Sequence, residues 1–204
     1  MRVLSLPLLA GALVLGACAS DEALAPGDGT SAPDARAASS QASRPKSGFE
    51  IQYMEFAVDH HTMGIMMIEM CLEMAFHEPL LELCRRNLEA QTRERELLLA
   101  WLQEWYGLAY QPQIPPGQLT TMEHLAELSE AEFEIEFMET FSRHHHQIIQ
   151  RSSPVARQAA HEPLQELAAT IVAAQSADIQ AMLNWLCVWY DICHPRFGFN
   201  PTGG

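Results

Sequence analysis

The sequence predicts an all-α protein, a four-helix bundle made of two duplicated helical hairpins that a long crossover connects. Three observations lead to this prediction. The chain repeats itself after 84 residues, apolar residues recur at steps of three and four within each repeat, and a long segment with three prolines separates the repeats.

The internal repeat is the most informative feature of the chain. The pair His60-His61 recurs at His144-His145, and the same shift brings further residues into register without a gap. The matched residues are His77-Glu78-Pro79-Leu80 with His161-Glu162-Pro163-Leu164, Gln91 with Gln175, and Trp101, Trp105 and Tyr106 with Trp185, Trp189 and Tyr190. A match of this length indicates a tandem duplication, with repeats at 48–106 and 130–194.

Each repeat is expected to fold as two helices. In the first helix, apolar residues fall on two neighbouring stripes and polar residues on a third line, which is the pattern of a bundle helix. The second helices are expected to begin with Pro79 and Pro163, because proline suits the first turn of a helix, and to end at Tyr106 and Tyr190. The histidine two residues before each of these prolines is expected to be a turn or cap residue.

The segment 107–129 connects the two repeats. Residues 120–123 and 129–132 both have the capping-box pattern, which predicts a short helix inside the crossover and then the start of the third long helix. A connection of this length can run along a bundle. It therefore favours a ferritin-like arrangement, in which a pseudo-twofold axis relates the hairpins.

The two ends of the chain differ in composition from the repeats. Residues 1–17 hold one arginine, a short apolar run and small residues before Cys18, which is typical of a bacterial lipoprotein signal peptide with Cys18 as the lipidated residue. Cleavage at a nearby small residue without lipidation is the alternative. Residues 18–47 are expected to be a disordered tether and 195–204 a tail. We therefore expect a lipid-anchored protein of the bacterial cell envelope, in the periplasm or at the outer surface.

The balance of charges limits the partners and activities of the chain. Twelve basic residues against 26 acidic ones give a formal charge of −14, which disfavours binding to nucleic acid. The second helices lack the Glu-x-x-His pair of di-iron bundles, and the sequence shows neither a Gly-rich phosphate loop nor a nucleophile with an evident base. We expect a protein that is not an enzyme, with a copper redox activity as an open alternative.

The two histidine pairs are candidate metal ligands. His60, His61, His144 and His145 lie on the apolar stripes near the middle of the first helix of each repeat, and they are expected to face the interior. Imidazole is the commonest metal ligand among protein side chains. A hydrogen-bonded interior network without metal is the alternative.

Polar residues of the second helices are expected to lie beside these histidines. If the first hairpin turns near residues 77–78, Glu94 lies level with His61, and by the repeat Asp178 lies level with His145. A carboxylate next to an imidazole is a common outer partner of a metal-binding histidine. Gln91 and Gln175, one turn away, are expected to assist.

Methionines distinguish the first repeat from the second. Met63 and Met67 follow His60 on one stripe, and thioethers combined with imidazoles favour copper, Cu(I) above all. The second repeat has Gln147 and Arg151 at these positions, so a site of this kind is expected mainly in the first repeat. Adaptable core packing is the alternative for the methionines.

Four cysteines follow Cys18. The hairpin register places Cys71 opposite Cys84, which predicts a disulfide between them, and a second disulfide, Cys187–Cys193, is expected to hold the C-terminal tail. The alternative is that Cys71 is a thiolate ligand beside the methionines.

These residues resemble the pattern of the domain of unknown function family numbered 305. Its elements are an apolar lead-in, His-His, a nearby Met, Gln-x-x-Glu/Asp, and a Trp near the hairpin end. They correspond here to Phe56, His60, His61, Met67, Gln91, Glu94 and Trp101, and then to Phe141, His144, His145, Gln175, Asp178, Met182 and Trp185. The resemblance covers 49–190 as two copies. It implies a ferritin-like bundle in exported bacterial proteins, some of which are associated with copper binding.

The leading interpretation is an exported lipoprotein that binds copper for sequestration or handling in the cell envelope. Its ligands would be His60, His61, Met63 and Met67, with Glu94 orienting an imidazole. The expected partners are a metal ion and, through the lipid anchor only, a membrane; an envelope protein partner stays open. The alternative is a structural or interaction bundle with a polar core that holds no metal.

Overall fold

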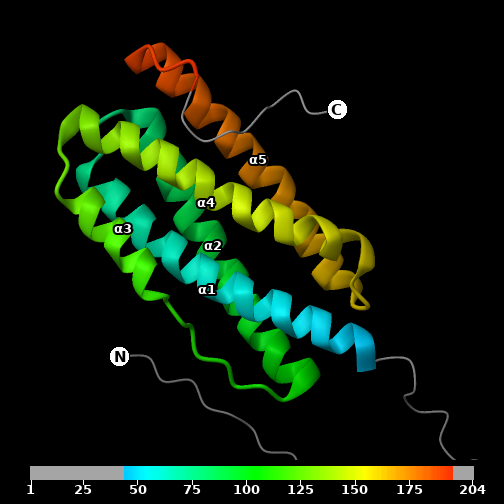
Figure 1. The fold of residues 1–204 in the computed structure, drawn as a ribbon. Coiled ribbons are helices and arrows are strands. Elements are labelled where there is room, and N and C mark those ends of the chain that lie inside the picture. Colours follow the sequence, from blue (N-terminus) through cyan, green and yellow to red (C-terminus); the bar gives the residue numbers. More distant parts are fainter. Residues whose placement is uncertain (1–43, 195–204) are drawn as a thin grey trace, which may run out of the picture. The chain divides into compact units, whose positions relative to one another are not determined.

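The computed structural model describes residues 44–194, which form five α-helices and no strand (Figure 1). The prediction of an all-helical chain is therefore confirmed for this part of the protein. The helices are α1 (Arg44–Met74), α2 (Glu78–Tyr106), α3 (Pro116–Ala126), α4 (Glu130–Gln158) and α5 (Glu162–Tyr190). The expected signal peptide, Cys18, residues 18–43 of the tether and the tail 195–204 lie outside the described residues.

Most helix boundaries in the structure agree with those predicted from the sequence. Helix α1 begins at Arg44, four residues before the composition boundary at 48. The capping boxes were wrong in detail: α3 begins at Pro116, so the expected cap at residue 120 lies inside the helix, and Ser129 precedes α4 without a side-chain cap bond. His77 and His161 are the N-cap residues of α2 and α5, as expected.

The helices pack in two antiparallel pairs. Helix α1 runs along α2 and α4 along α5, and the pairs meet chiefly through α1 and α4, while α3 contacts both α1 and α4 (Figure 1). None of the helices in residues 44–194 combines the length and apolarity that a membrane span needs. Two disulfides, Cys71–Cys84 and Cys187–Cys193, are the pairs expected from the sequence. Cys71 therefore offers no thiolate.

The interior consists of two apolar clusters with a polar layer between them. One cluster contains residues 63–71 of α1 and 133–141 of α4. The other cluster contains residues 53–58 of α1 and 148–155 of α4. The residues between these segments form the polar layer together with facing residues of α2 and α5. The layer contains His60, His61, Gln91, Glu94, His144, His145 and Gln175.

A buried carboxylate from each hairpin holds the start of the other hairpin's second helix. Glu134 of α4 accepts hydrogen bonds from the backbone N–H groups of Phe76 and His77 at 2.7 and 2.8 Å, from Nδ1 of His77 at 2.6 Å, and from the Tyr190 hydroxyl at 2.5 Å. The His77 ring stacks on Trp189 with ring centroids 4.1 Å apart. We call this group the Glu134 cluster.

The Glu50 cluster repeats this arrangement at the opposite ends of α2 and α5, with Glu50 supplied by α1. Glu50 accepts hydrogen bonds from the backbone of Ala160 and His161, from Nδ1 of His161 and from the Tyr106 hydroxyl, and His161 stacks on Trp105. Neither glutamate was predicted from the sequence, although the two match at the repeat spacing. The two clusters tie the hairpins to each other at both ends.

We expect the Glu50 and Glu134 clusters to stabilise the protein at neutral pH and to lose this stabilisation in acid. Burial alone raises the pKa of Glu50 and Glu134, but the hydrogen bonds donated to each carboxylate outweigh burial, and each pKa ends below its ordinary value. Their stabilisation is therefore fully present above about pH 4.5, the unfolded-state pKa range, and is lost as pH falls through the lower folded-state pKa.

We expect the urea midpoint to fall between pH 5 and pH 3, and to fall less steeply in the double variant Glu50→Gln, Glu134→Gln. Chemical unfolding at stepped pH, followed by circular dichroism, measures this. Glu132→Gln, at an exposed position of α4, is the control. Equal slopes for the wild type and the double variant would contradict the assignment.

Candidate metal centre

Four imidazoles occupy the polar layer, two from α1 and two from α4. His60 and His144 stack with ring centroids 3.6 Å apart, and Nε2 of His60 lies 2.9 Å from the backbone oxygen of His144. Because a carbonyl oxygen only accepts, His60 Nε2 carries the proton of the neutral ring and Nδ1 carries the lone pair. The stacking pairs one histidine from each repeat.

Burial keeps three of these rings, His60, His144 and His145, neutral. Burial, followed by the neighbouring imidazoles, holds the pKa of His144 well below its usual value. The same two causes hold the pKa of His60 well below the usual range, against an opposing hydrogen bond to the His144 backbone. Burial also lowers the pKa of His145, although the Asp178 carboxylate opposes this shift. Neutral imidazole is the form that offers a lone pair to a metal ion.

The carboxylates lie where the hairpin register places them. His61 Nε2 is 2.9 Å from Glu94 Oε2, and His145 Nε2 is 3.4 Å from Asp178 Oδ2. Neither contact has hydrogen-bond geometry. Asn87, which the sequence analysis missed, donates to Asp178 Oδ2 at 2.8 Å and thereby joins the two hairpins.

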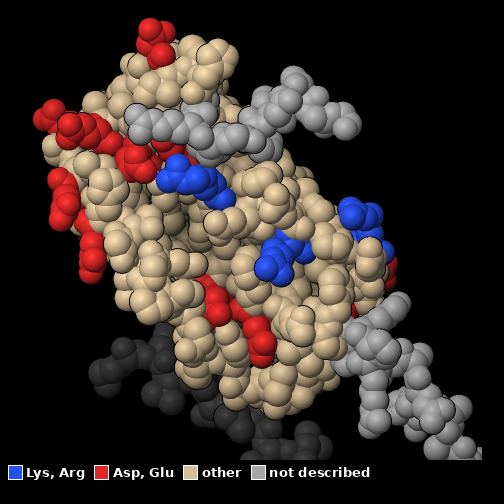
Figure 2. All heavy atoms as spheres, viewed as in Figure 1, with Lys and Arg blue, Asp and Glu red and all other residues tan. Residues whose placement is uncertain are grey.

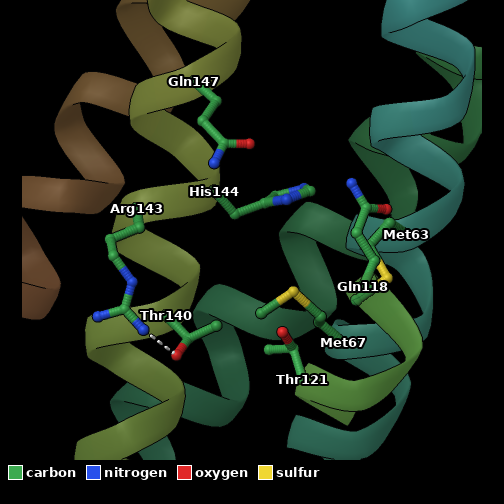
Figure 3. A pocket seen from close by; sticks show the side chains of 8 residues that line it. All are labelled: Met63, Met67, Gln118, Thr121, Thr140, Arg143, His144 and Gln147. Atoms are coloured by element: carbon green, nitrogen blue, oxygen red, sulfur yellow. Dashed lines mark hydrogen bonds between the residues drawn. The ribbon is translucent and has the colours of Figure 1, made fainter. Parts of the chain in front are cut away.

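A pocket of about 170 Å³ opens beside the layer, and Met63, Met67 and His144 all line it. His144 reaches from α4 into the pocket, and the two methionines face it from α1 (Figure 3). The remaining lining residues are polar or basic: Gln118 and Thr121 from α3, and Thr140, Arg143 and Gln147 from α4. Arg143 is held at the pocket wall by a 2.6 Å hydrogen bond from Nη2 to the Thr140 hydroxyl.

The predicted site residues thus divide into two groups. The structure brings Met63 and Met67 together with His144 from the other repeat, while His61 and His145 face Glu94 and Asp178. His60 packs against His144 and does not line the pocket. Within residues 44–194, no group of three or more His, Cys, Asp or Glu side chains is arranged to hold a metal ion.

Several buried polar atoms of the layer have no hydrogen-bond partner among the described residues. They are His60 Nδ1, both ring nitrogens of His61 and of His145, His144 Nε2, Gln91 Oε1 and Gln175 Oε1. Buried polar atoms nearly always have a partner in a folded protein. This concentration of unpartnered atoms indicates a layer that accommodates a ligand or water.

The surface adds a further electrostatic feature. Acidic side chains gather near α3 and the start of α4 on the face shown in Figure 2, where basic side chains are few. An acidic surface raises the local concentration of cations.

Comparison with known proteins identifies similar chains. The sequence profile of the domain of unknown function DUF305 matches residues 28–106 and 50–186. Among solved structures, CopM in its Cu(I)-bound form is similar, with a TM-score of 0.63 and 26% identity over 69% of this chain and 97% of that chain. CopM in its Cu(II)-bound form gives a TM-score of 0.62 with the same identity and coverage.

A DUF305 protein from Streptomyces coelicolor has the same fold, with a TM-score of 0.61 and 16% identity over 68% of this chain and 91% of that chain. No curated protein matches the chain significantly.

Proposed function

The chain belongs to the DUF305 family, and from this premise we propose that it binds a soft metal ion, copper as Cu(I), in the pocket between α1 and α4. The observation that carries the proposal is the position of His144 Nε2, a buried imidazole nitrogen without a hydrogen-bond partner in a pocket that two thioethers also line. CopM, which is 26% identical, is described in Cu(I)-, Cu(II)- and Ag-bound forms.

The donor chemistry supports a soft monovalent ion over a divalent one. Met63 and Met67 offer thioethers and His144 a neutral imidazole, and soft, uncharged donors of this kind favour Cu(I). The residues that line the pocket include no carboxylate, and Arg143 places a positive charge at its wall. Hard cations such as Mg²⁺ and Ca²⁺ prefer oxygen ligands and are disfavoured here.

The other histidines support this site in the proposal. His60 orients His144 through ring stacking and through its hydrogen bond to the His144 backbone. The layer beside the pocket also contains His61 next to Glu94 and His145 next to Asp178. In the proposal these two histidines are alternative ligands for the metal ion.

The cellular role follows from the ends of the chain and from its disulfides. We assign a signal peptide at 1–17, lipidation at Cys18 and a periplasmic or outer-surface location, because the sequence pattern supports export and two disulfides suit an oxidising compartment. A ferritin-like four-helix bundle would then hold copper for sequestration or transfer. The proposed activity is binding and not catalysis.

Replacement of both thioethers tests the proposed donor set. In the double variant Met63→Leu, Met67→Leu, we expect affinity for Ag(I) and Cu(I) to fall about 100-fold or more, because leucine keeps the volume and removes the sulfur. Competition titration against a chelator of known affinity measures the change. Ag(I) needs no reductant, and ascorbate maintains Cu(I) while sparing the disulfides.

The titration uses the full chain with Cys18→Ser in every sample, so that the cysteine outside the two disulfides adds no thiol. Met74→Leu, on the same helix but outside the pocket lining, is the matched control. Unchanged affinity in the double variant would remove the methionines from the site. No uptake by the wild type would end the proposal and leave a helical protein with a polar interior.

A further inference from the structure

A glycine lies inside α1 at the level of the polar layer. Gly64 is buried between the histidine pair and Met67. Glycine in a helix interior costs about 1 kcal/mol relative to alanine. The equivalent position of the second repeat holds Ile148, which is fully buried. The two repeats therefore differ strongly in side-chain volume at this interior position.

The space beside Gly64 is occupied by two polar atoms from other helices. A Cβ atom at this position would lie 2.1 Å from Gln91 Oε1 and 3.0 Å from His144 Nε2. Any side chain at residue 64 would therefore displace Gln91 and crowd the imidazole. The same distances place the two polar atoms within 5.1 Å of each other, the sum of the two values.

Both atoms are buried and neither has a hydrogen-bond partner among the described residues. A single long hydrogen bond at its other end sets the orientation of the Gln91 amide. Its Nε2 donates to Asn87 Oδ1 at 3.4 Å, and Asn87 Nδ2 donates in turn to the Leu83 backbone oxygen and to Asp178. Gln91 Oε1 consequently points toward Gly64 and the free nitrogen of His144.

The corresponding place in the second repeat is closed. Gln147, Ile148 and Arg151 stand where the first repeat has Met63, Gly64 and Met67. The nitrogen equivalent to His144 Nε2 is His60 Nε2, which is already engaged with a backbone oxygen. The Arg151 guanidinium lies over the Phe56 ring at 5.1 Å and adds a positive charge there.

We propose that Gln91 Oε1 is a weak oxygen donor that supplements the three soft donors of the metal site. Gly64 makes room for this oxygen, and the chain binds one ion, on the first-repeat side of the polar layer. This inference rests on the proposed function. It adds a residue from α2 to the donor set and fixes the stoichiometry. Gly64 acts through Gln91 and His144, as a positioning residue.

The test compares Gly64→Ala and Gln91→Ala with the wild type by Ag(I) competition titration and thermal unfolding of the full chain carrying Cys18→Ser. Gly64→Ala is expected to lower the affinity about tenfold or more, the range found for residues that position metal ligands. It is also expected to leave thermal stability unchanged or raise it, because alanine favours the helix and the Gln91 side chain can swing aside. Opposite signs for affinity and stability exclude a merely structural role.

The double variant Gly64→Ala, Gln91→Ala tests whether Gly64 affects metal affinity through Gln91. Once Gln91 is removed, Gly64→Ala keeps only its effect on His144. A double-mutant cycle is therefore expected to show that Gly64→Ala lowers the affinity less in the Gln91→Ala background than in the wild type. Gln180→Ala, which removes an exposed glutamine of α5, is the control and is expected to bind like the wild type.

The outcomes separate this inference from the proposed function. One equivalent of Ag(I) for the wild type with weakened binding in Gly64→Ala and Gln91→Ala supports the inference. Wild-type affinity in both variants, or two equivalents of equal affinity in the wild type, overturns it and leaves the proposed function standing. No Ag(I) uptake by the wild type overturns both.

Discussion

Replacing His144 with alanine is expected to abolish tight binding of Cu(I) and Ag(I), with a loss of affinity of about 1,000-fold. His144 Nε2 is the imidazole nitrogen that lines the pocket with the two thioethers. Without it the pocket keeps weak, neutral donors. Competition titration of the full chain with Cys18→Ser measures the loss, and ultracentrifugation or light scattering confirms that the variant remains monodisperse.

The control for this variant lies two residues along the same helix. His146→Ala removes an imidazole that is half-exposed, contacts Gln150 and does not line the pocket. It is expected to bind like the wild type. Because His144→Ala also removes buried volume, a second variant, His144→Gln, keeps most of the side chain and is expected to bind weakly as well. Tight binding in both His144 variants would move the site away from this pocket.

Replacing Glu134 with alanine is expected to destabilise the protein by about 3–5 kcal/mol, the loss that follows removal of one partner from a buried charged network. The carboxylate accepts four hydrogen bonds, and its removal leaves two backbone N–H groups at the start of α2, the His77 ring and the Tyr190 hydroxyl without their acceptor. Glutamine in its place is expected to be less harmful, because an amide oxygen can still accept some of these bonds.

Chemical unfolding at pH 7 measures this effect as a shift in midpoint at constant slope. Glu132→Ala, two residues away and exposed, is expected to change stability by less than about 0.5 kcal/mol. A Glu134→Ala midpoint equal to that of Glu132→Ala would show that the cluster contributes little. Metal affinity is expected to be unaffected in either variant, because the Glu134 cluster lies at the helix ends, away from the pocket.

The sequence predicted those parts of the structure that depend on periodicity along one chain segment. The repeat spacing and the helical stripes gave the long helices, and counting residues from the hairpin turn placed Glu94 beside His61 and Cys71 opposite Cys84. Such register arguments succeed because two antiparallel helices joined by a short turn have little freedom to slide.

Features that depend on how the two hairpins face each other could not be predicted. Stripe analysis grouped Met63 and Met67 with His60 of their own helix, but the pocket pairs them with His144, because the rotation of α4 against α1 is not encoded in either helix alone. Glu50 and Glu134 could have been found from the sequence, because a glutamate recurs at the repeat spacing near the start of the first helix of each hairpin. The role of Gly64 needed three-dimensional positions, because a glycine in a sequence does not say which atoms approach it.

The crossed carboxylate clusters have a consequence for the origin of the chain. Each hairpin supplies the acceptor that the other hairpin's second helix requires, so one hairpin alone leaves its own helix start unsatisfied, whereas two identical hairpins about a twofold axis satisfy each other. The simplest ancestor is therefore a homodimer of hairpins. Fusion of two such hairpins makes a concentration-dependent assembly intramolecular and frees two identical surfaces to diverge. In this chain the first half has a glycine and two methionines at the proposed site, whereas the second half has isoleucine at the position of the glycine.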